Sequence, residues 1–211
     1  MKDYVKNNQK VYDRLAQEYK ERRKDYIVSE RKIAAPFINY LKRTFDKIRI
    51  LELGPGSGLN LSYFLQENFK TTAIDISQKI IDVARQIAPK TEYIHDEFLE
   101  HDFRQTKYEG IFAKAFIHLF PKKDAILVLK KIKALLVPGG AVFVATTVHP
   151  KSEEGFFEKK DYAGKLKRFR KMWTEKELLD LISALGFKII DKGYHIEEDK
   201  EKIWINLVII K

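Results

Sequence analysis

Short apolar runs alternate with amphipathic segments through the middle of the chain. The runs are rich in Ile, Leu, Val and Phe and end at glycine or polar residues, which predicts strands over 47–53, 71–75, 91–95, 110–116 and 141–147. The segments between them have apolar residues at helical spacing, which predicts helices over 59–67, 78–87 and 122–136. A chain in which strands alternate with helices is expected to form a mostly parallel sheet with helices on both faces.

The N-terminal region departs from this alternation. Its apolar residues predict a helix over 3–24, and a second helix that Ser29 would cap and that runs to about Phe45 with a kink near Pro36. We therefore expect residues 1–45 to form a helical cap on the domain.

The C-terminal region predicts the last helix and the last two strands of the sheet. Thr174 is placed to cap a helix that ends at Leu185, and two apolar runs, 187–190 and 202–210, predict the last two strands. The connection over 191–201 is too short for a helical crossover, so the final strand should be antiparallel to its neighbours. The expected fold class is α/β, with a seven-stranded, mostly parallel sheet and an antiparallel last strand.

Composition narrows the class of protein. The chain has 211 residues, of which 45 % are hydrophobic, and we expect a single domain over 1–211. It has no cysteine, which excludes disulfides, thiolate zinc sites and a cysteine nucleophile, and we expect no metal site. The charged start and the lack of a long apolar stretch predict a soluble, cytoplasmic protein without a membrane segment. The net charge of +10 leaves a nucleic-acid partner possible, although solvated lysines on helix faces account for it more simply.

A glycine loop follows the first predicted strand. Gly54, Gly56 and Gly58 let backbone amides approach a ligand closely, and Asp75, at the end of the next strand, could accept hydrogen bonds from ribose hydroxyls. Together they indicate an adenosine-containing ligand at the carboxyl edge of the sheet. Glu52, two residues before the loop, would repel a pyrophosphate and suits a cationic ligand, which favours S-adenosylmethionine over NAD.

Five stretches, in this order along the chain, resemble the motifs of the class I S-adenosylmethionine-dependent methyltransferases. They are Tyr12–Tyr19, Glu52–Gly58, Ala73–Ser77, Tyr108–Leu119 and Leu135–Phe143. The resemblance covers nearly the whole chain and implies a Rossmann-like fold with S-adenosylmethionine as cofactor and S-adenosylhomocysteine as product. The cofactor-binding residues that it implies, together with Glu52, are Gly54 and Gly56 at the methionine part, Asp75 at the ribose, and Ile76, Asp96, Glu97, Phe98, Ala115 and Tyr19 around the remainder.

The residues that would act on the acceptor are less clearly marked. His118 is the candidate catalytic base, and His149, after the fifth strand, is a second histidine at the same edge. Residues 150–172 look like a lid or insertion. The aromatic residues expected to line the acceptor pocket are Phe156, Phe157, Tyr162, Phe169 and Trp173, and the basic ones are Lys165, Lys167, Arg168, Arg170 and Lys171.

The substrate class follows from what the sequence lacks. The segment Ala113–Phe116 has none of the N/D-P-P-Y/F pattern of enzymes that methylate amino groups of nucleic acids, and Lys114 is an unexpected neighbour for a cationic cofactor. We therefore expect a methyltransferase with a small-molecule acceptor. An RNA or protein methyltransferase is the alternative, and an NAD-dependent oxidoreductase is a weaker one.

Overall fold

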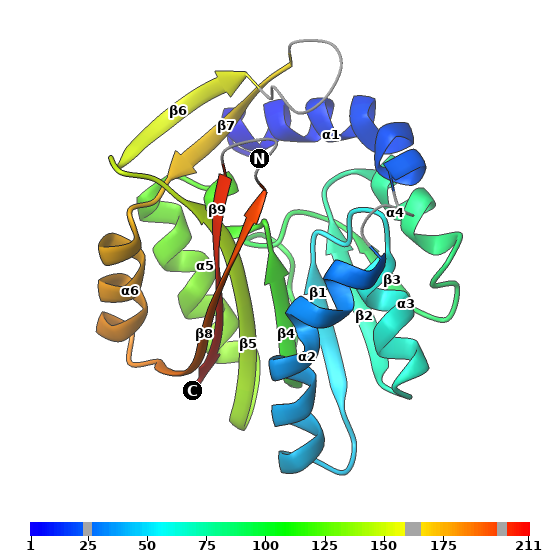
Figure 1. The fold of residues 1–211 in the computed structure, drawn as a ribbon. Coiled ribbons are helices and arrows are strands. Elements are labelled where there is room, and N and C mark those ends of the chain that lie inside the picture. Colours follow the sequence, from blue (N-terminus) through cyan, green and yellow to red (C-terminus); the bar gives the residue numbers. More distant parts are fainter. Residues whose placement is uncertain (23–26, 159–165, 198–201) are drawn as a thin grey trace.

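The computed structural model describes residues 1–22, 27–158, 166–197 and 202–211. Its centre is a seven-stranded sheet with the strand order β3-β2-β1-β4-β5-β9-β8 (Figure 1). The strands are β1 (Arg49–Leu53), β2 (Lys70–Asp75), β3 (Glu92–His95), β4 (Tyr108–Lys114), β5 (Leu136–Val148), β8 (Lys188–Glu197) and β9 (Lys202–Ile210). The predicted α/β class and the seven strands of the sheet are confirmed.

The last strand is antiparallel, as its short connection predicts. β9 pairs antiparallel with β5 and with β8, whereas the other neighbouring strands of the sheet pair parallel to one another. β8 is longer than predicted, because it continues alongside β9 as far as Glu197. Its polar alternation beyond Ile190 resembles a loop in the sequence, and only the pairing with β9 makes it a strand.

Helices cover both faces of the sheet. The helices are α1 (Asp3–Glu21), α2 (Ile27–Thr44), α3 (Leu59–Gln66), α4 (Gln78–Arg85), α5 (Lys122–Leu135) and α6 (Glu175–Ala184). Neighbouring strand residues point to opposite faces, so Ile111 packs with Val128 of α5 and Leu178 of α6, whereas Phe112 packs with Phe37 of α2 and Phe64 of α3. Both clusters are buried, and together they hold the sheet between two helical layers.

Two elements lie across the end of the sheet at which the parallel strands finish (Figure 1). They are α1 and an antiparallel hairpin of β6 (Glu153–Glu158) and β7 (Lys167–Met172). Asn8 of α1 accepts a hydrogen bond from the backbone N–H of Phe169 in β7 at 2.8 Å, and the Tyr4 and Phe169 rings are 5.2 Å apart. The hairpin forms most of the predicted lid segment; its action as a lid stays a prediction.

Two local predictions differ from the structure. Ser29 was expected to cap the second helix, but α2 already begins at Ile27, so Ser29 lies inside its first turn. The strand predicted over 141–147 begins earlier, because β5 already starts at Leu136 and includes Pro138, Gly139 and Gly140; Gly139 has a φ of 74°, and the pairing with β4 shifts register there. In the parts of the chain that the structure describes, no helix has the length and apolar character needed to cross a membrane.

Candidate functional site

A cavity of about 420 Å³ opens at the carboxyl ends of β1, β2 and β4, beneath α1. This is the edge at which open α/β sheets bind their ligands. The predicted cofactor-binding residues and the candidate base all line this cavity: Tyr19, Glu52, Gly54, Gly56, Asp75, Ile76, Asp96, Glu97, Phe98, Ala115 and His118. The structure therefore brings together residues that lie up to about a hundred positions apart in the sequence.

The glycine loop adopts backbone conformations that other residues disfavour. Gly54, Gly56 and Gly58 have φ values of 72°, 53° and 82°. A Cβ at Gly58 would lie 2.8 Å from the backbone of Ala84 in α4, so the loop can only pack there without a side chain. A Cβ at Gly56 would meet the ring of Tyr19 at 3.4 Å, which places the predicted tyrosine of α1 directly over the loop.

Asp75 ends β2 beside the same loop. A Cβ built on Gly54 would lie 3.9 Å from Oδ2 of Asp75, so the carboxylate and the glycine bend face one another. Its Oδ1 accepts a hydrogen bond from the backbone N–H of Ser77 at 2.8 Å. Burial raises the pKa of Asp75 to about 7, although the Ser77 N–H favours the ionised form.

A buried cluster of charged and polar side chains lies at the side of the cavity where the resemblance places the methionine part of the cofactor. Glu52 Oε1 accepts a hydrogen bond from Asn60 at 3.4 Å, and Glu30 of α2 pairs with Lys114 of β4. Glu52 Oε2, Glu30 Oε2 and Asn60 Oδ1 are buried acceptors with no hydrogen-bond partner among the described residues. Burial and the nearby Glu30 raise the pKa of Glu52 well above its usual value. Lys114, the unexpected neighbour of a cationic cofactor, therefore neutralises the carboxylate of Glu30. The sequence does not indicate this pair, because the two residues lie 84 positions apart.

The three residues after β3 have separate environments. Asp96 accepts hydrogen bonds from the backbone N–H of Glu97 and interacts with His101 at 2.9 Å, and the His101 contact lowers the pKa of Asp96. Glu97 accepts from the backbone N–H groups of Leu99 and Glu100, so its carboxylate holds the turn together. Phe98 is buried and meets the ring of Phe116 edge-on at 5.8 Å.

His118 is held in place between β4 and β5. It lies in the 3₁₀ turn η2 (Ile117–Leu119), and its Nδ1 is 3.1 Å from Oγ1 of Thr146. The chain reaches this turn through Ala115, whose φ of 56° is unusual for a residue other than glycine. The side chain of His118 is buried and lines the cavity, so a bound acceptor could contact it.

The hairpin contributes cations to the cavity rather than the predicted aromatic wall. Arg168 and Arg170 of β7 and Lys202 of β9, which we call the cationic end, line it. The expected aromatic wall is wrong: Trp173 is fully buried in the main core, Phe169 packs against Tyr4, and Phe156 is 52 % exposed. Phe157 does not contribute to the wall of the cavity either. Tyr162 and Lys165 lie outside the described residues.

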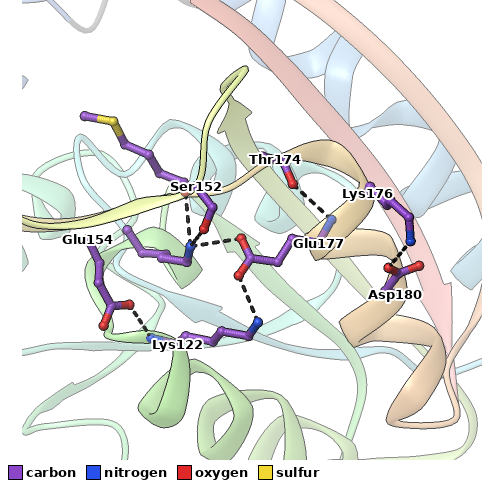
Figure 2. Close-up of polar contacts among 9 residues, drawn as sticks. Lys122, Ser152, Glu154, Thr174, Lys176, Glu177 and Asp180 are labelled. Carbon is purple, nitrogen blue, oxygen red and sulfur yellow. Dashed lines mark hydrogen bonds and ion pairs between the residues drawn. The ribbon is translucent and has the colours of Figure 1, made fainter.

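Lys171 also differs from its prediction. It does not face the cavity, because its ammonium pairs with Glu177 of α6 at 2.9 Å, and Lys122 of α5 contacts the other oxygen of Glu177 at 3.0 Å (Figure 2). Burial opposes ionisation of Glu177, but hydrogen bonds from Lys171, Lys122 and Ser152 lower its pKa to about 2. The two ion pairs of Glu177 therefore join the end of β7 to the N-termini of α5 and α6.

Comparison with known proteins identifies the family. A family model described as a methyltransferase domain matches residues 9–192. The chain belongs to this methyltransferase family. The match includes the glycine loop, Asp75 and both arginines of the cationic end.

Individual relatives are distant. A ubiquinone biosynthesis O-methyltransferase of Methylocella silvestris is 30 % identical over 124 residues, which are 53 % of this chain and 44 % of the relative. The chain spans less than half the length of the first curated relatives that it matches.

Two solved structures show the same fold. The 1,6-didemethyltoxoflavin-N1-methyltransferase of Burkholderia thailandensis has a TM-score of 0.69 at 20 % identity, over 86 % of this chain and 77 % of that chain. The magnesium protoporphyrin IX methyltransferase of Synechocystis PCC 6803 has a TM-score of 0.72 at 14 % identity, over 99 % of this chain and 100 % of that chain. Both were solved with bound S-adenosylhomocysteine.

Proposed function

We propose that the chain is an S-adenosylmethionine-dependent methyltransferase that acts on a small-molecule acceptor. The observation that carries this proposal is the position of Asp75 directly opposite the glycine bend, inside a cavity at the carboxyl edge of the sheet. A carboxylate there can accept hydrogen bonds from both ribose hydroxyls, while the loop leaves room for the rest of the ligand. The family match and the S-adenosylhomocysteine in similar structures support the same cofactor.

The buried acceptors at the other side of the loop suit the amino-acid part of this cofactor. An ammonium group has three N–H donors, and Glu52, Glu30 and Asn60, which line the cavity, each have a buried acceptor oxygen with no hydrogen-bond partner among the described residues. A bound ammonium would also compensate the charge of Glu52, whose ionisation burial disfavours. A pyrophosphate would meet like charge at this position, which argues against NAD.

The bound cofactor supplies an electrophilic methyl group on a sulfonium. The protein's own contribution is to orient the acceptor and to remove its proton where the acceptor atom carries one. His118 is the residue proposed for proton removal, because it is buried beside the cavity and Thr146 fixes its ring. A small acceptor fits the enclosure, because α1 lies over the cavity and is tied to β7 through Asn8. The similar structures named above are also methyltransferases of small molecules.

Calorimetric titration with S-adenosylhomocysteine tests the proposal. We expect micromolar binding by the unchanged chain and a loss of at least about a hundredfold in Asp75→Ala, because two charge-assisted hydrogen bonds disappear. Asp82→Ala removes a carboxylate from the exposed side of α4 and should leave binding unchanged. The absence of binding to the unchanged chain would contradict the proposal.

The acceptor class has its own test. Incubation with methyl-labelled cofactor and a metabolite extract should give a labelled small molecule in the mass spectrum. The alternative RNA acceptor is suggested by the +10 charge, and it predicts salt-dependent retention of mixed RNA on a filter. Strong retention at low salt together with labelled RNA would replace the small-molecule proposal.

A further inference from the structure

We propose that Lys114 binds the carboxylate of the cofactor's amino-acid part and makes the site select a zwitterion over a simple amine. This inference rests on the proposed function, since it concerns the same cofactor. It goes further by giving a binding role to a lysine that is an unexpected neighbour for a sulfonium.

Lys114 and Glu52 lie on the same face of the sheet. Glu52 of β1 is in register with Phe112 of β4, and Lys114 follows Phe112 by two positions. Residues two positions apart in a strand point to the same face. Phe112 packs against α2 and α3, which are the helices that carry Glu30 and Asn60. The four polar side chains therefore meet between this face of the sheet and the two helices.

The ammonium of Lys114 has donors to spare. Among the described residues, its Nζ pairs with Oε1 of Glu30 and lies 6.0 Å from the centre of the Trp204 ring. An ammonium has three N–H donors, and the pair with Glu30 uses one of them. Lys114 lines the cavity, where its side chain is 20 % exposed. The remaining donors can therefore bind an anionic group of a ligand.

The acceptors of the same cluster are arranged for a cation. Glu52, Glu30 and Asn60 are only 2 %, 8 % and 8 % exposed, and all three line the cavity. Each has one buried oxygen without a hydrogen-bond partner in the part of the chain that the structure describes. Buried acceptors without a donor are costly, so these oxygens indicate a ligand that carries N–H groups.

An α-amino acid carries its ammonium and its carboxylate on the same carbon atom. A protein cation that binds the carboxylate must therefore lie beside the acceptors that bind the ammonium. Lys114 meets this requirement, because one oxygen of Glu30 pairs with it while the other is open to the ligand. The cationic end comes instead from β7 and β9, away from the strand and the helices of this cluster.

The charge of Lys114 sets the direction of the selection. Burial and then Glu30 raise the pKa of Glu52, whereas Asn60 and Lys114 oppose this rise, so the lysine charge reaches Glu52 as well. A ligand with an ammonium alone would place a second cation beside Lys114 with no anion between them. A zwitterion places its carboxylate there, so charges of opposite sign alternate through the site.

The test compares three nucleoside probes by calorimetric titration. S-adenosylhomocysteine carries both groups, decarboxylated S-adenosylhomocysteine keeps only the ammonium, and methylthioadenosine lacks both. The unchanged chain should bind S-adenosylhomocysteine at least about tenfold more tightly than the decarboxylated probe. Lys114→Met should abolish this preference, and Lys114→Arg should keep most of it, because the positive charge remains.

A second pair of variants keeps the test independent of stability. Lys114→Met removes the counter-ion of Glu30, so the comparison is repeated in a chain that carries Glu30→Gln. Glu30→Gln alone should weaken both amino probes and keep the preference, and the addition of Lys114→Met should remove it. Methylthioadenosine should bind all of these variants equally, which shows that the nucleoside site is intact. Lys79→Met, at an exposed position of α4, should keep the preference.

The outcomes separate this inference from the proposed function. Equal binding of the two amino probes to the unchanged chain would overturn the inference. A preference for the carboxylate that persists after Lys114→Met, with or without Glu30→Gln, would also overturn it. If neither S-adenosylhomocysteine nor methylthioadenosine binds the unchanged chain, the proposed function itself is refuted.

Discussion

The hydroxyl of Ser77 donates a hydrogen bond to the carboxylate of Asp13 at 2.5 Å and so joins α1 to the first turn of α4. The same oxygen accepts from the backbone N–H of Ile80 at 3.2 Å, which makes Ser77 the N-cap of α4. One side chain therefore both starts a helix and holds the element that covers the cavity.

Ser77→Ala is expected to weaken both the fold and the site. The loss of a cap and of a partly buried hydrogen bond to a carboxylate should reduce the free energy of unfolding by about 2 kcal/mol. S-adenosylhomocysteine should also bind less tightly, because α1 is less firmly held over the loop. Urea unfolding and calorimetry measure the two effects. Ser183→Ala, at an exposed position near the end of α6, should change neither.

The pKa of Asp75 predicts a pH dependence of binding. With a pKa of about 7, the carboxylate is protonated at pH 6 and ionised at pH 8. Ribose hydroxyls donate to the ionised form, so the affinity for S-adenosylhomocysteine should fall by about tenfold between pH 8 and pH 6. Affinity that stays constant from pH 8 to pH 5 would contradict this role of Asp75.

The same shift predicts the sign of a stability change. The folded pKa of Asp75 lies above the unfolded value of 3.8, so the unliganded protein loses stability as the pH rises from about 4 to about 7. Asp75→Asn keeps an acceptor for the Ser77 N–H and removes the buried charge. The variant should therefore unfold at a higher temperature than the unchanged chain at pH 8, and the two should converge near pH 4.

The Glu30–Lys114 pair should be strongly coupled. Lys114→Met leaves Glu30 and Glu52 together in a buried site, which should cost about 3 kcal/mol of unfolding free energy at pH 8. Glu30→Gln in the same chain should restore most of that loss. Guanidinium unfolding of the two single variants and the double variant gives the coupling energy, and strictly additive effects would show that the pair does not interact.

Glu177 should stabilise the protein only above the pH at which it ionises. Its folded pKa of about 2 lies below its usual 4.5, so its contribution is fully present above pH 4.5 and is lost as the pH falls toward 2. Glu177→Gln should lower the free energy of unfolding by about 2 kcal/mol at pH 7, because the buried ammonium of Lys171 then lacks a carboxylate counter-ion. Asp180→Asn, on an exposed pair of the same helix, should have little effect.

The sequence predicts the parts of the site that local patterns determine. The glycine loop and Asp75 follow from a strand that ends in glycines and a next strand that ends in a carboxylate, and parallel pairing of β1 with β2 then brings them together. The N-cap at Thr174 is equally local and is also confirmed, because its hydroxyl accepts a hydrogen bond from the backbone N–H of Glu177 at 3.2 Å. Ser29 was wrongly placed as a cap because helix boundaries depend on contacts as well as on capping residues.

The parts that the sequence does not predict depend on long-range contacts. Glu30 lies on a helix whose pattern shows only an exposed acid, until α2 packs beside β4 and Lys114 reaches it. Trp173 was expected at the acceptor because it follows a basic aromatic segment, but its bridge to Val148 places it in the core. Arg168 and Arg170 were predicted only as part of a basic segment, and the pairing of β6 with β7 places both on the same side.

The antiparallel direction of β9 has a consequence for how substrate choice can change. Because β9 starts at the edge of the sheet where the parallel strands end, Lys202 and Trp204 reach the cavity from the amino end of a strand that contributes nothing to the glycine loop. The residues proposed to hold the nucleoside thus lie in the first half of the chain, and much of the opposite side of the cavity comes from its last forty-five residues. Mutations that exchange one acceptor for another can accumulate in the second region while cofactor affinity is preserved.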